Sequence, residues 1–353
     1  MIVDVHGHTV APPELYEYAL RLLASRGSHG RAGLKISDDR LEASLGPFLE
    51  MLEAVGTDVQ FISPRPFATM HAERPAKVVT WMTEATNDVI ARQVALAGGR
   101  LRGIGGLPQA PGTTPGDWVA EMDRCVDELG FVGVLLNPDP AEGVDQLPPM
   151  GDEWWYPLYE AMVERDLPAI VHPGGNRNGR ESYSSHFITE ESIAVLSLID
   201  GKVFERFPGL KLVICHGGGS VPYQVGRWRA LRWRHWRPAL DMRELSRQDT
   251  DQLRSKLADV ESFDASLRHL YFDTVLYNRE SIELLLKIVG ADRCLFGTEL
   301  PGTGSSVDPG TGRWLDDLKP VIEEIDFLTD IDRESIFEGN ARSVFTRAFD
   351  DQS

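Results

Sequence analysis

The length, composition and charge of the chain exclude several classes of protein. It has 353 residues, of which 42% are hydrophobic and 25% charged, an ordinary globular composition. The formal net charge of −18 argues against a nucleic-acid partner, because phosphate binding needs a basic surface. No apolar run reaches the roughly 18 residues of a membrane-spanning helix, and the opening MIVDVHGH contains no signal-like stretch. We therefore expect a cytoplasmic protein with neither a membrane nor a nucleic-acid partner.

Eight short runs rich in apolar and β-branched residues recur along the chain. Most are continuous, as in VGVLL and KLVICH, which is typical of parallel strands covered on both faces. The predicted strands, in chain order, are Ile2–Val5, Val59–Ser63, Arg102–Leu107, Val132–Leu136, Ala169–His172, Lys211–His216, His269–Asp273 and Cys294–Gly297.

The segments between these runs have the pattern of amphipathic helices. Apolar residues recur at spacings of three and four in residues 13–25, 45–56 and 115–130. The segments VAEMDRCVDELG and IELLLKIVG each end at a glycine, the usual C-terminal stop of a helix. Alternating strands and helices predict an α/β protein. Eight strands without a second domain predict a single (β/α)₈ TIM barrel over residues 1–353.

Three longer segments are predicted to be insertions in the loops of this barrel. Gly27–Asp39 follows the first helix, Asn176–Thr189 follows the fifth strand, and Gly226–Phe263 precedes the seventh. The first two are placed to shape the C-terminal mouth of the barrel, where the active sites of barrel enzymes lie.

Polar residues with ligand chemistry follow five of the predicted strands. His6 and His8 are two residues apart at the end of the first strand, so their side chains point to one face. The other residues of this kind are His172, His216, Asp273 and Glu299, after strands five to eight. Histidines that repeatedly end buried strands indicate a shared task. Two or three imidazoles and a carboxylate make a zinc site with an open position, so we predict one metal ion per chain.

The motifs HGH, VHPGG, CHGGG, YFDT and FGTELP occur here in the order and spacing of the amidohydrolase-related family. That family includes aminocarboxymuconate-semialdehyde decarboxylases, resorcylate decarboxylases and 4-oxalomesaconate hydratases. The chain resembles the hydratases of aromatic-acid (protocatechuate and gallate) degradation further in RGSHGR, ISPRPF, LLNPDP, HFITEES and CHGGGSVPYQ. The resemblance covers essentially the whole chain.

The resemblance implies a ligand set and a reaction. Zinc is expected on His6, His8, His172 and Glu299, which leaves His216 as a catalytic acid or base. The decarboxylases usually carry Asp where Glu299 stands, in a GSDYP-like context. The expected reaction is reversible addition of water to the conjugated C=C of an oxo-polycarboxylate.

Further acid–base roles are predicted around this centre. His216 would move a proton at the attacking water, because an imidazole titrates near neutral pH. Glu190 or Glu191 would deliver a proton to carbon, although both also suit a helix N-terminus capped by Thr189. Asp273 is expected to orient His216 or the metal water.

Five residues are candidates for binding the substrate. Arg65, in ISPRPF after the second strand, can grip a carboxylate bidentately or serve a structural role between its prolines. Asn137 after the fourth strand and Ser28 and His29 in the first long loop are weaker candidates, as is His186. The remaining histidines, expected on the surface or in packing, are His71, His235 and His269.

One segment departs from the resemblance. WRALRWRHWRPALDMRELSRQ, within Trp228–Phe263, is longer and richer in arginine and tryptophan than the hydratases lead us to expect. Residues 226–263 are therefore predicted to be a helical insertion that packs through its tryptophans or contacts another subunit. A lid that supplies arginine to a polyanionic substrate is the alternative. The arginines are Arg227, Arg229, Arg232, Arg234, Arg237, Arg243 and Arg247.

Other activities remain open on the same scaffold. A non-oxidative decarboxylase of a hydroxylated aromatic or muconate-type acid is the first alternative, and a metal-dependent hydrolase is the second. A non-catalytic zinc-dependent binding protein is disfavoured, because a competent residue occupies every metal and acid–base position. The sequence does not separate zinc from manganese. By resemblance, we expect a homodimer.

Overall fold

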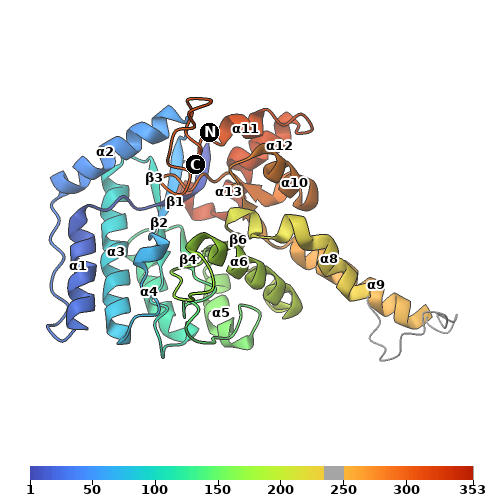
Figure 1. Cartoon of the computed structure of the whole chain (residues 1–353), viewed down its shortest axis with the longest axis horizontal. Coiled ribbons are helices and arrows are strands. Elements are labelled where there is room, and N and C mark those ends of the chain that lie inside the picture. Colours follow the sequence, from blue (N-terminus) through green and yellow to red (C-terminus); the bar gives the residue numbers. More distant parts are fainter. Residues whose placement is uncertain (234–249, 353) are drawn as a thin grey trace.

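Eight parallel strands lie at the centre of the computed structural model, which describes residues 1–233 and 250–352 (Figure 1). The strands pair in sequence order. Val5 N donates to Phe296 O at 2.9 Å and Glu299 N to His6 O at 2.8 Å, which joins the first strand to the segment after the last. The predicted (β/α)₈ barrel is confirmed. The strands are β1 (Val3–His8), β2 (Val59–Ser63), β3 (Leu101–Gly106), β4 (Gly133–Leu136), β5 (Ala169–Val171), β6 (Leu212–Ile214), β7 (Tyr271–Asp273) and β8 (Cys294–Leu295).

Helices surround the strands (Figure 1). They are α1 (Pro13–Ser25), α2 (Asp38–Ala54), α3 (Ala76–Leu96), α4 (Pro115–Asp127), α5 (Tyr156–Glu164), α6 (Tyr183–Asp200), α7 (Val203–Arg206), α8 (Val221–Trp233), α9 (Thr250–Leu267), α10 (Arg279–Val289), α11 (Lys319–Glu323), α12 (Asp330–Glu334) and α13 (Asn340–Val344). In the described part of the chain, no helix has both the length and the hydropathy needed to cross a membrane.

The first strand extends through His8 and is longer than predicted. The buried carboxylate of Asp4 holds this longer strand in place. One of its oxygens accepts from His6 N at 3.0 Å and the other from Gln60 Nε2 at 2.7 Å. Thr298, after β8, also donates to Asp4 through its amide and its hydroxyl. A Cβ on Gly7 would lie 2.4 Å from Cδ of Gln60, so only glycine fits between the two histidines of HGH.

Apolar side chains fill the barrel below the strand ends. Val5, Phe61 and Ile104 point into this core and are at most 1% exposed. The ring of Phe345, which follows α13, packs edge-on against Phe61 with centroids 5.0 Å apart. Burial of rings this large contributes about 2–3 kcal/mol each. The barrel is therefore a packed support for the side chains at its mouth, and not a pore.

The helix after the fifth strand begins earlier than predicted. Ser182 caps α6, because its Oγ accepts from Ser185 N at 3.2 Å. The prediction that Thr189 caps a helix there is wrong. Thr189 lies within α6 and donates to Ser185 O at 2.9 Å. Glu190 and Glu191 consequently lie beyond the first helical turn, where they project from different faces of the helix.

The predicted insertion, residues 226–263, includes the end of α8 and most of α9, and these two helices project away from the barrel (Figure 1). Arg229 Nε binds Asp264 Oδ1 at 2.6 Å, and Arg232 pairs with Asp200 and covers the Phe263 ring. Arg227 is exposed. These contacts give the first arginines roles in packing α8 against its neighbours. The predictions for Arg234, His235, Arg237, Arg243 and Arg247 fall outside the described residues.

Candidate metal centre and active site

Four predicted ligands meet at the carboxyl ends of the strands. His6, His8, His172 and Glu299 each offer one atom, and these atoms all lie within 4.8 Å of one another. All four side chains are buried, with at most 5% exposure. Both histidines of HGH come from β1, His172 directly follows β5, and Glu299 lies four residues after the end of β8. The sequence therefore brings three imidazoles and a carboxylate to one point of the barrel mouth.

Hydrogen bonds leave one nitrogen of each ligand histidine free. Nδ1 of His6 binds Asp273 Oδ2 at 2.7 Å, Nδ1 of His8 binds Ser63 Oγ at 3.0 Å, and Nδ1 of His172 binds the Pro173 carbonyl at 2.7 Å. In all three, Nε2 is buried and has no hydrogen-bond partner among the described residues. Partners of this kind fix the tautomer in metal-binding histidines. Buried, unpaired nitrogens facing a carboxylate fit a divalent cation.

The surroundings keep the imidazoles of His8 and His172 neutral. Burial, and after it the neighbouring histidines, hold the pKa of His8 and the pKa of His172 well below the usual range. A neutral imidazole has the lone pair that a metal ligand needs. Burial alone would raise the pKa of Glu299, but the positive charge of His216, whose Nε2 lies 3.7 Å from Oε1, outweighs burial and lowers this pKa. Glu299 is therefore anionic, as a carboxylate ligand of a metal ion would be.

The backbone and Tyr277 position Glu299. Its φ of 64° lies in the left-handed region, where a residue with a Cβ is held only by its surroundings. Its amide donates to His6 O, while its Oε2 accepts from the Tyr277 hydroxyl and from Thr303 N. Oε1 then faces Nε2 of His216 at 3.7 Å. The role of Tyr277 escaped the sequence prediction, although the residue lies three positions after the YFDT motif.

His216 forms a pair with Glu191. Its Nδ1 lies 2.6 Å from Glu191 Oε1, and the Phe187 ring stacks on it at 5.7 Å with planes 12° apart. Burial acts to lower the pKa of His216, but Glu191 and then Glu299 outweigh it and raise that pKa well above its ordinary value. Glu191 is fully buried, and burial raises the pKa of its carboxyl to about 7. His216 thus stands beside the ligand cluster with a carboxylate behind it.

Asp273 has a different partner from the one predicted. It was expected to orient His216 or the metal water, whereas its Oδ2 holds His6 and its Oδ1 accepts from Gly217 N and Val275 N. The carboxylate that orients His216 is Glu191. The physical reason is the turn after β6, because His216 has a φ of 48° that directs the chain away from the strand line.

The two glutamates of HFITEES face different neighbours. Glu191 binds His216 as described, whereas Glu190 turns toward Asp139 and His186. His186 is buried, with Nδ1 3.1 Å from Glu181 Oε2. The structure therefore does not place Glu190 or His186 in contact with the four ligands.

The remaining predicted contacts divide into one near the centre and three elsewhere. Arg65 donates to the Thr9 and Pro301 carbonyls between the loops after β1 and β8, and its charge lowers the pKa of His8. Asn137 is buried, and both ends of its amide are used, by His71 and by Asp139 N. Ser28 and His29 are exposed beyond α1, and no contact among the described residues links them to the ligands. His71 and His269 lie in packing, His269 against Phe204.

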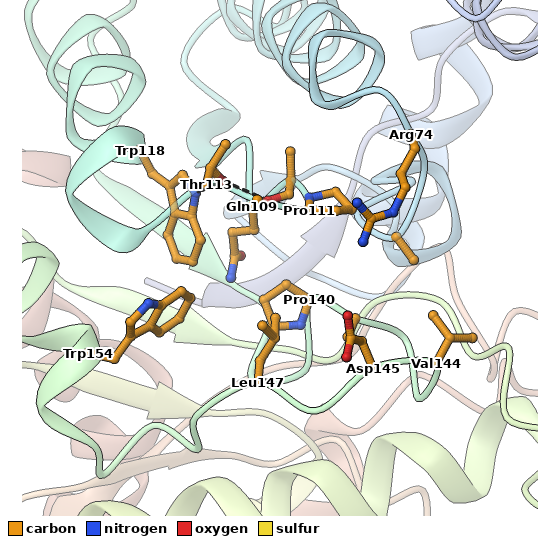
Figure 2. Close-up of a pocket in the computed structure, with 14 residues that line it drawn as sticks. Arg74, Gln109, Pro111, Thr113, Trp118, Pro140, Val144, Asp145, Leu147 and Trp154 are labelled. Carbon is orange, nitrogen blue, oxygen red and sulfur yellow. Dashed lines mark hydrogen bonds between the residues drawn. The ribbon is translucent and has the colours of Figure 1, made fainter.

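A separate cavity of about 250 Å³ lies between the loops that follow β3 and β4 (Figure 2). Trp118 and Trp154 flank one end, and Arg74 and Asp145 lie toward the other. None of the residues lining it belongs to the ligand cluster. Gln109 in its wall exchanges hydrogen bonds with the Asn137 backbone. The cavity is thus a neighbour of the barrel mouth and not the floor of the metal centre.

A parallel eight-stranded barrel that gathers three histidines and a glutamate at its strand ends is the architecture of the metal-dependent barrel enzymes. The chain belongs to the amidohydrolase family, whose model matches residues 3–347. It is an enzyme of a metal-dependent superfamily, and its candidate metal site lies at the barrel mouth.

Two similar proteins are hydratases. The 2-keto-4-carboxy-3-hexenedioate hydratase of Sphingobium sp. (strain SYK-6) is 36% identical, with 98% of this chain and 96% of the relative covered. The crystal structure of 4-oxalomesaconate hydratase from Rhodopseudomonas palustris is 34% identical, with 98% and 96% covered and a TM-score of 0.81.

Decarboxylases are more distant relatives. The γ-resorcylate decarboxylase of Polaromonas sp. (strain JS666) is 29% identical over 73% of this chain and 74% of its own. A dihydroxybenzoic acid decarboxylase structure from Polaromonas sp. JS666 contains bound manganese, with 22% identity, 98% and 96% coverage and a TM-score of 0.68.

Proposed function

We propose that this enzyme is a hydratase that adds water reversibly to the conjugated C=C of an oxo-polycarboxylate such as 4-oxalomesaconate. The observation that carries this choice is its likeness to two hydratases, at 36% and 34% identity, along 98% of the chain. The decarboxylase similarity is lower in identity and covers less of the sequence. Decarboxylation therefore stands as the second candidate.

We propose zinc as the ion, held by His6, His8, His172 and Glu299. Three imidazoles and one carboxylate suit zinc, although the carboxylate also suits manganese. When bound, the ion supplies Lewis-acid polarisation of the substrate carbonyl or of water. Manganese in the Polaromonas structure makes it the alternative ion.

Proton transfer is assigned to His216. Its Nε2 faces the ligand cluster, and its raised pKa keeps the ring protonated at rest. The ring therefore gives a proton to one alkene carbon and takes one back from the water whose oxygen adds to the other alkene carbon. Glu191 positions the ring and stabilises its positive charge through Nδ1 at 2.6 Å. Glu191 has no exposed surface, so it acts through His216 and does not reach the substrate itself.

Arg65 is proposed to bind a substrate carboxylate. It is half-buried, and the carbonyls of Thr9 and Pro301 hold it between two loops of the mouth. An arginine beside the centre offsets part of the −18 net charge that would otherwise repel a polyanion. We further propose that the enzyme is a cytoplasmic homodimer, to be tested by cell fractionation and light scattering.

One incubation separates the two candidate reactions. Purified enzyme is given 4-oxalomesaconate and, separately, γ-resorcylate, in deuterated and ordinary water. A hydratase adds the mass of one water, keeps every carbon, incorporates deuterium at carbon and reaches the same equilibrium from both directions. Release of CO₂ in step with substrate loss would replace the hydratase with a decarboxylase.

A further inference from the structure

A second cluster of ligating side chains lies outside the centre already described. Asp139, in the loop after β4, meets His186 and Glu190 of α6, and each offers one atom within 4.8 Å of the others. None of these residues belongs to the set of His6, His8, His172 and Glu299. We propose that Asp139, His186 and Glu190 bind a second divalent cation.

His186 points an unpaired nitrogen into this cluster. Its side chain is 2% exposed, and its Nε2 has no hydrogen-bond partner among the described residues. The nearest carboxylate oxygen, Asp139 Oδ2, lies 3.8 Å away, which is too long for a hydrogen bond. Two ligands of one ion, each about 2.1 Å from it, are separated by about 3–4 Å. The distance therefore suits a shared cation better than a direct contact.

The other ring nitrogen is held in the way that metal ligands usually are. Nδ1 of His186 lies 3.1 Å from Glu181 Oε2. A carboxylate on one nitrogen fixes the tautomer and leaves the second nitrogen as a donor to an ion. The same arrangement holds His6 in the first centre, where Asp273 is the carboxylate.

Charge at the cluster is out of balance. Three carboxylates, those of Asp139, Glu181 and Glu190, surround one imidazole. Among the residues that the structure describes, no lysine or arginine forms an ion pair with any of the three. Burial of negative charge without a partner is costly. A divalent cation would offset it, and a single protonated imidazole would leave an excess of two negative charges.

The ligands are preorganised and reachable. Asp139 folds its own loop by accepting from Ala141 N at 3.2 Å and Gly143 N at 2.6 Å. His186 and Glu190 are four residues apart on α6, so they share one face of the helix. Asp139 and Glu190 also line a cavity of about 360 Å³, which provides an entry path. One imidazole and two carboxylates favour manganese or zinc over a hard cation such as calcium.

This cation would connect the β4 loop to the helix that carries Glu191. Phe187 and Glu191, one residue after His186 and Glu190, hold the His216 ring. A cation bound by His186 and Glu190 on one face of α6 therefore stabilises the positions of Phe187 and Glu191 on the other face. The role is structural and does not depend on which reaction the first centre catalyses.

The direct test is a crystal of chelated enzyme reloaded with Mn²⁺, measured at the manganese absorption edge. Two anomalous peaks are expected, one at the strand-end centre and one between Asp139, His186 and Glu190. A single peak at the first centre, under saturating Mn²⁺, would overturn the proposal. This measurement uses wild-type enzyme, so it does not depend on whether a variant folds.

Titration of variants assigns the second equivalent in solution. His186→Gln should lose one of two Mn²⁺ ions and keep the other, whereas His172→Ala should lose the ion that His186→Gln retains. Glu181→Gln should weaken the second ion about 10–100-fold through the loss of its support to His186. His71→Gln, which changes a buried histidine bonded to Asn137, is the matched control and should keep both. Two ions in both His186→Gln and Asp139→Asn would contradict the assignment.

Discussion

The carboxylate of Glu191 lies 2.6 Å from Nδ1 of His216, and the opposite nitrogen of that ring faces Glu299, a proposed metal ligand, at 3.7 Å. One imidazole thus joins a fully buried carboxylate to the ligand cluster. The direction of proton movement in the proposed reaction follows from this line of three groups.

Glu191→Gln should lower kcat about 10–100-fold while KM and metal content change little. The amide keeps the size of the side chain but removes the charge that stabilises the protonated His216 ring. Steady-state kinetics with metal analysis on the same samples provides the check. Glu160→Gln, at the surface of α5, controls for the loss of one negative charge. A loss of metal in Glu191→Gln would show that this residue supports the ligands and not the proton transfer.

His216→Asn should keep the ion and lose kcat by roughly 10²–10⁴, the usual contribution of a general acid–base residue. Its Nε2 faces the ligands but is not among the four atoms that meet. Elemental analysis beside the rate measurement decides the point. Loss of zinc from this variant would make His216 a ligand.

The strand-end centre should hold one zinc per chain, and the residues that hydrogen-bond its ligands should set the affinity for zinc. His172→Ala removes a ligand, so ion and activity should disappear together. Asp273→Asn leaves all four ligands but weakens the hold on His6 Nδ1, so the zinc Kd should rise about 10–100-fold. Competition with a chelator measures both variants. His269→Gln, whose ring stacks on Phe204, should match wild type. Equal zinc affinity of Asp273→Asn and wild type would rule out this role.

Arg65→Gln should raise KM for a polycarboxylate and lower kcat/KM about 10–100-fold, since a charge-assisted bond to a carboxylate is worth about 1.5–3 kcal/mol. Arg65→Lys should recover part of the loss. Because Arg65 also holds the Thr9 and Pro301 carbonyls, melting temperatures must accompany the kinetics. The test of specificity is a substrate monoester at each carboxylate. If Arg65→Gln lowers kcat/KM for every ester by as much as it does for the free acid, Arg65 does not bind a carboxylate.

In chelated protein, Glu190→Gln should raise stability at pH 8 and change it little at pH 5. Burial, followed by repulsion from Asp139, raises the pKa of Glu190 from 4.5 to about 7. The folded state then binds this proton more tightly than the unfolded chain, so the stabilisation present at low pH is lost as pH rises through about 7. After screening at this half-buried position we expect about 1–2 kcal/mol, seen as a melting point a few degrees higher. With saturating Mn²⁺ the sign should reverse. Equal shifts of the melting temperature at pH 5 and pH 8 would contradict the raised pKa of Glu190.

The strand-end cluster was predictable because simple patterns in the sequence mark both the strands and the residues at their ends. Apolar runs mark buried strands, and the polar residue that ends each run must lie at the carboxyl edge of a parallel barrel. His6 and His8 add the two-residue repeat of a strand. The fold and the clustering of these four residues therefore follow from local pattern together with the family resemblance.

Side-chain partners were less accessible from the sequence, because they depend on helix register and turn angles. Ser182, not Thr189, caps α6, and that difference of seven residues decides which glutamate faces His216. Asp273 follows its strand as predicted, yet the left-handed turn at His216 leaves His6 as its partner. No local pattern connects Glu191 to a histidine 25 residues away.

The hydrogen bond between Val5 and Phe296, which closes the barrel, affects how the newly made enzyme acquires its metal ion. The amide of Glu299 donates to the carbonyl of His6. The same contact that closes the barrel therefore brings the proposed ligands His6 and Glu299, from opposite ends of the chain, together. A nascent chain holds three histidine ligands long before the ribosome has made the glutamate. The ion can gain its full set of ligands only when the last strand docks on the first, and any affinity gained there stabilises the closed barrel over the open one. Metal supply during synthesis should therefore govern the yield of folded enzyme as well as its activity.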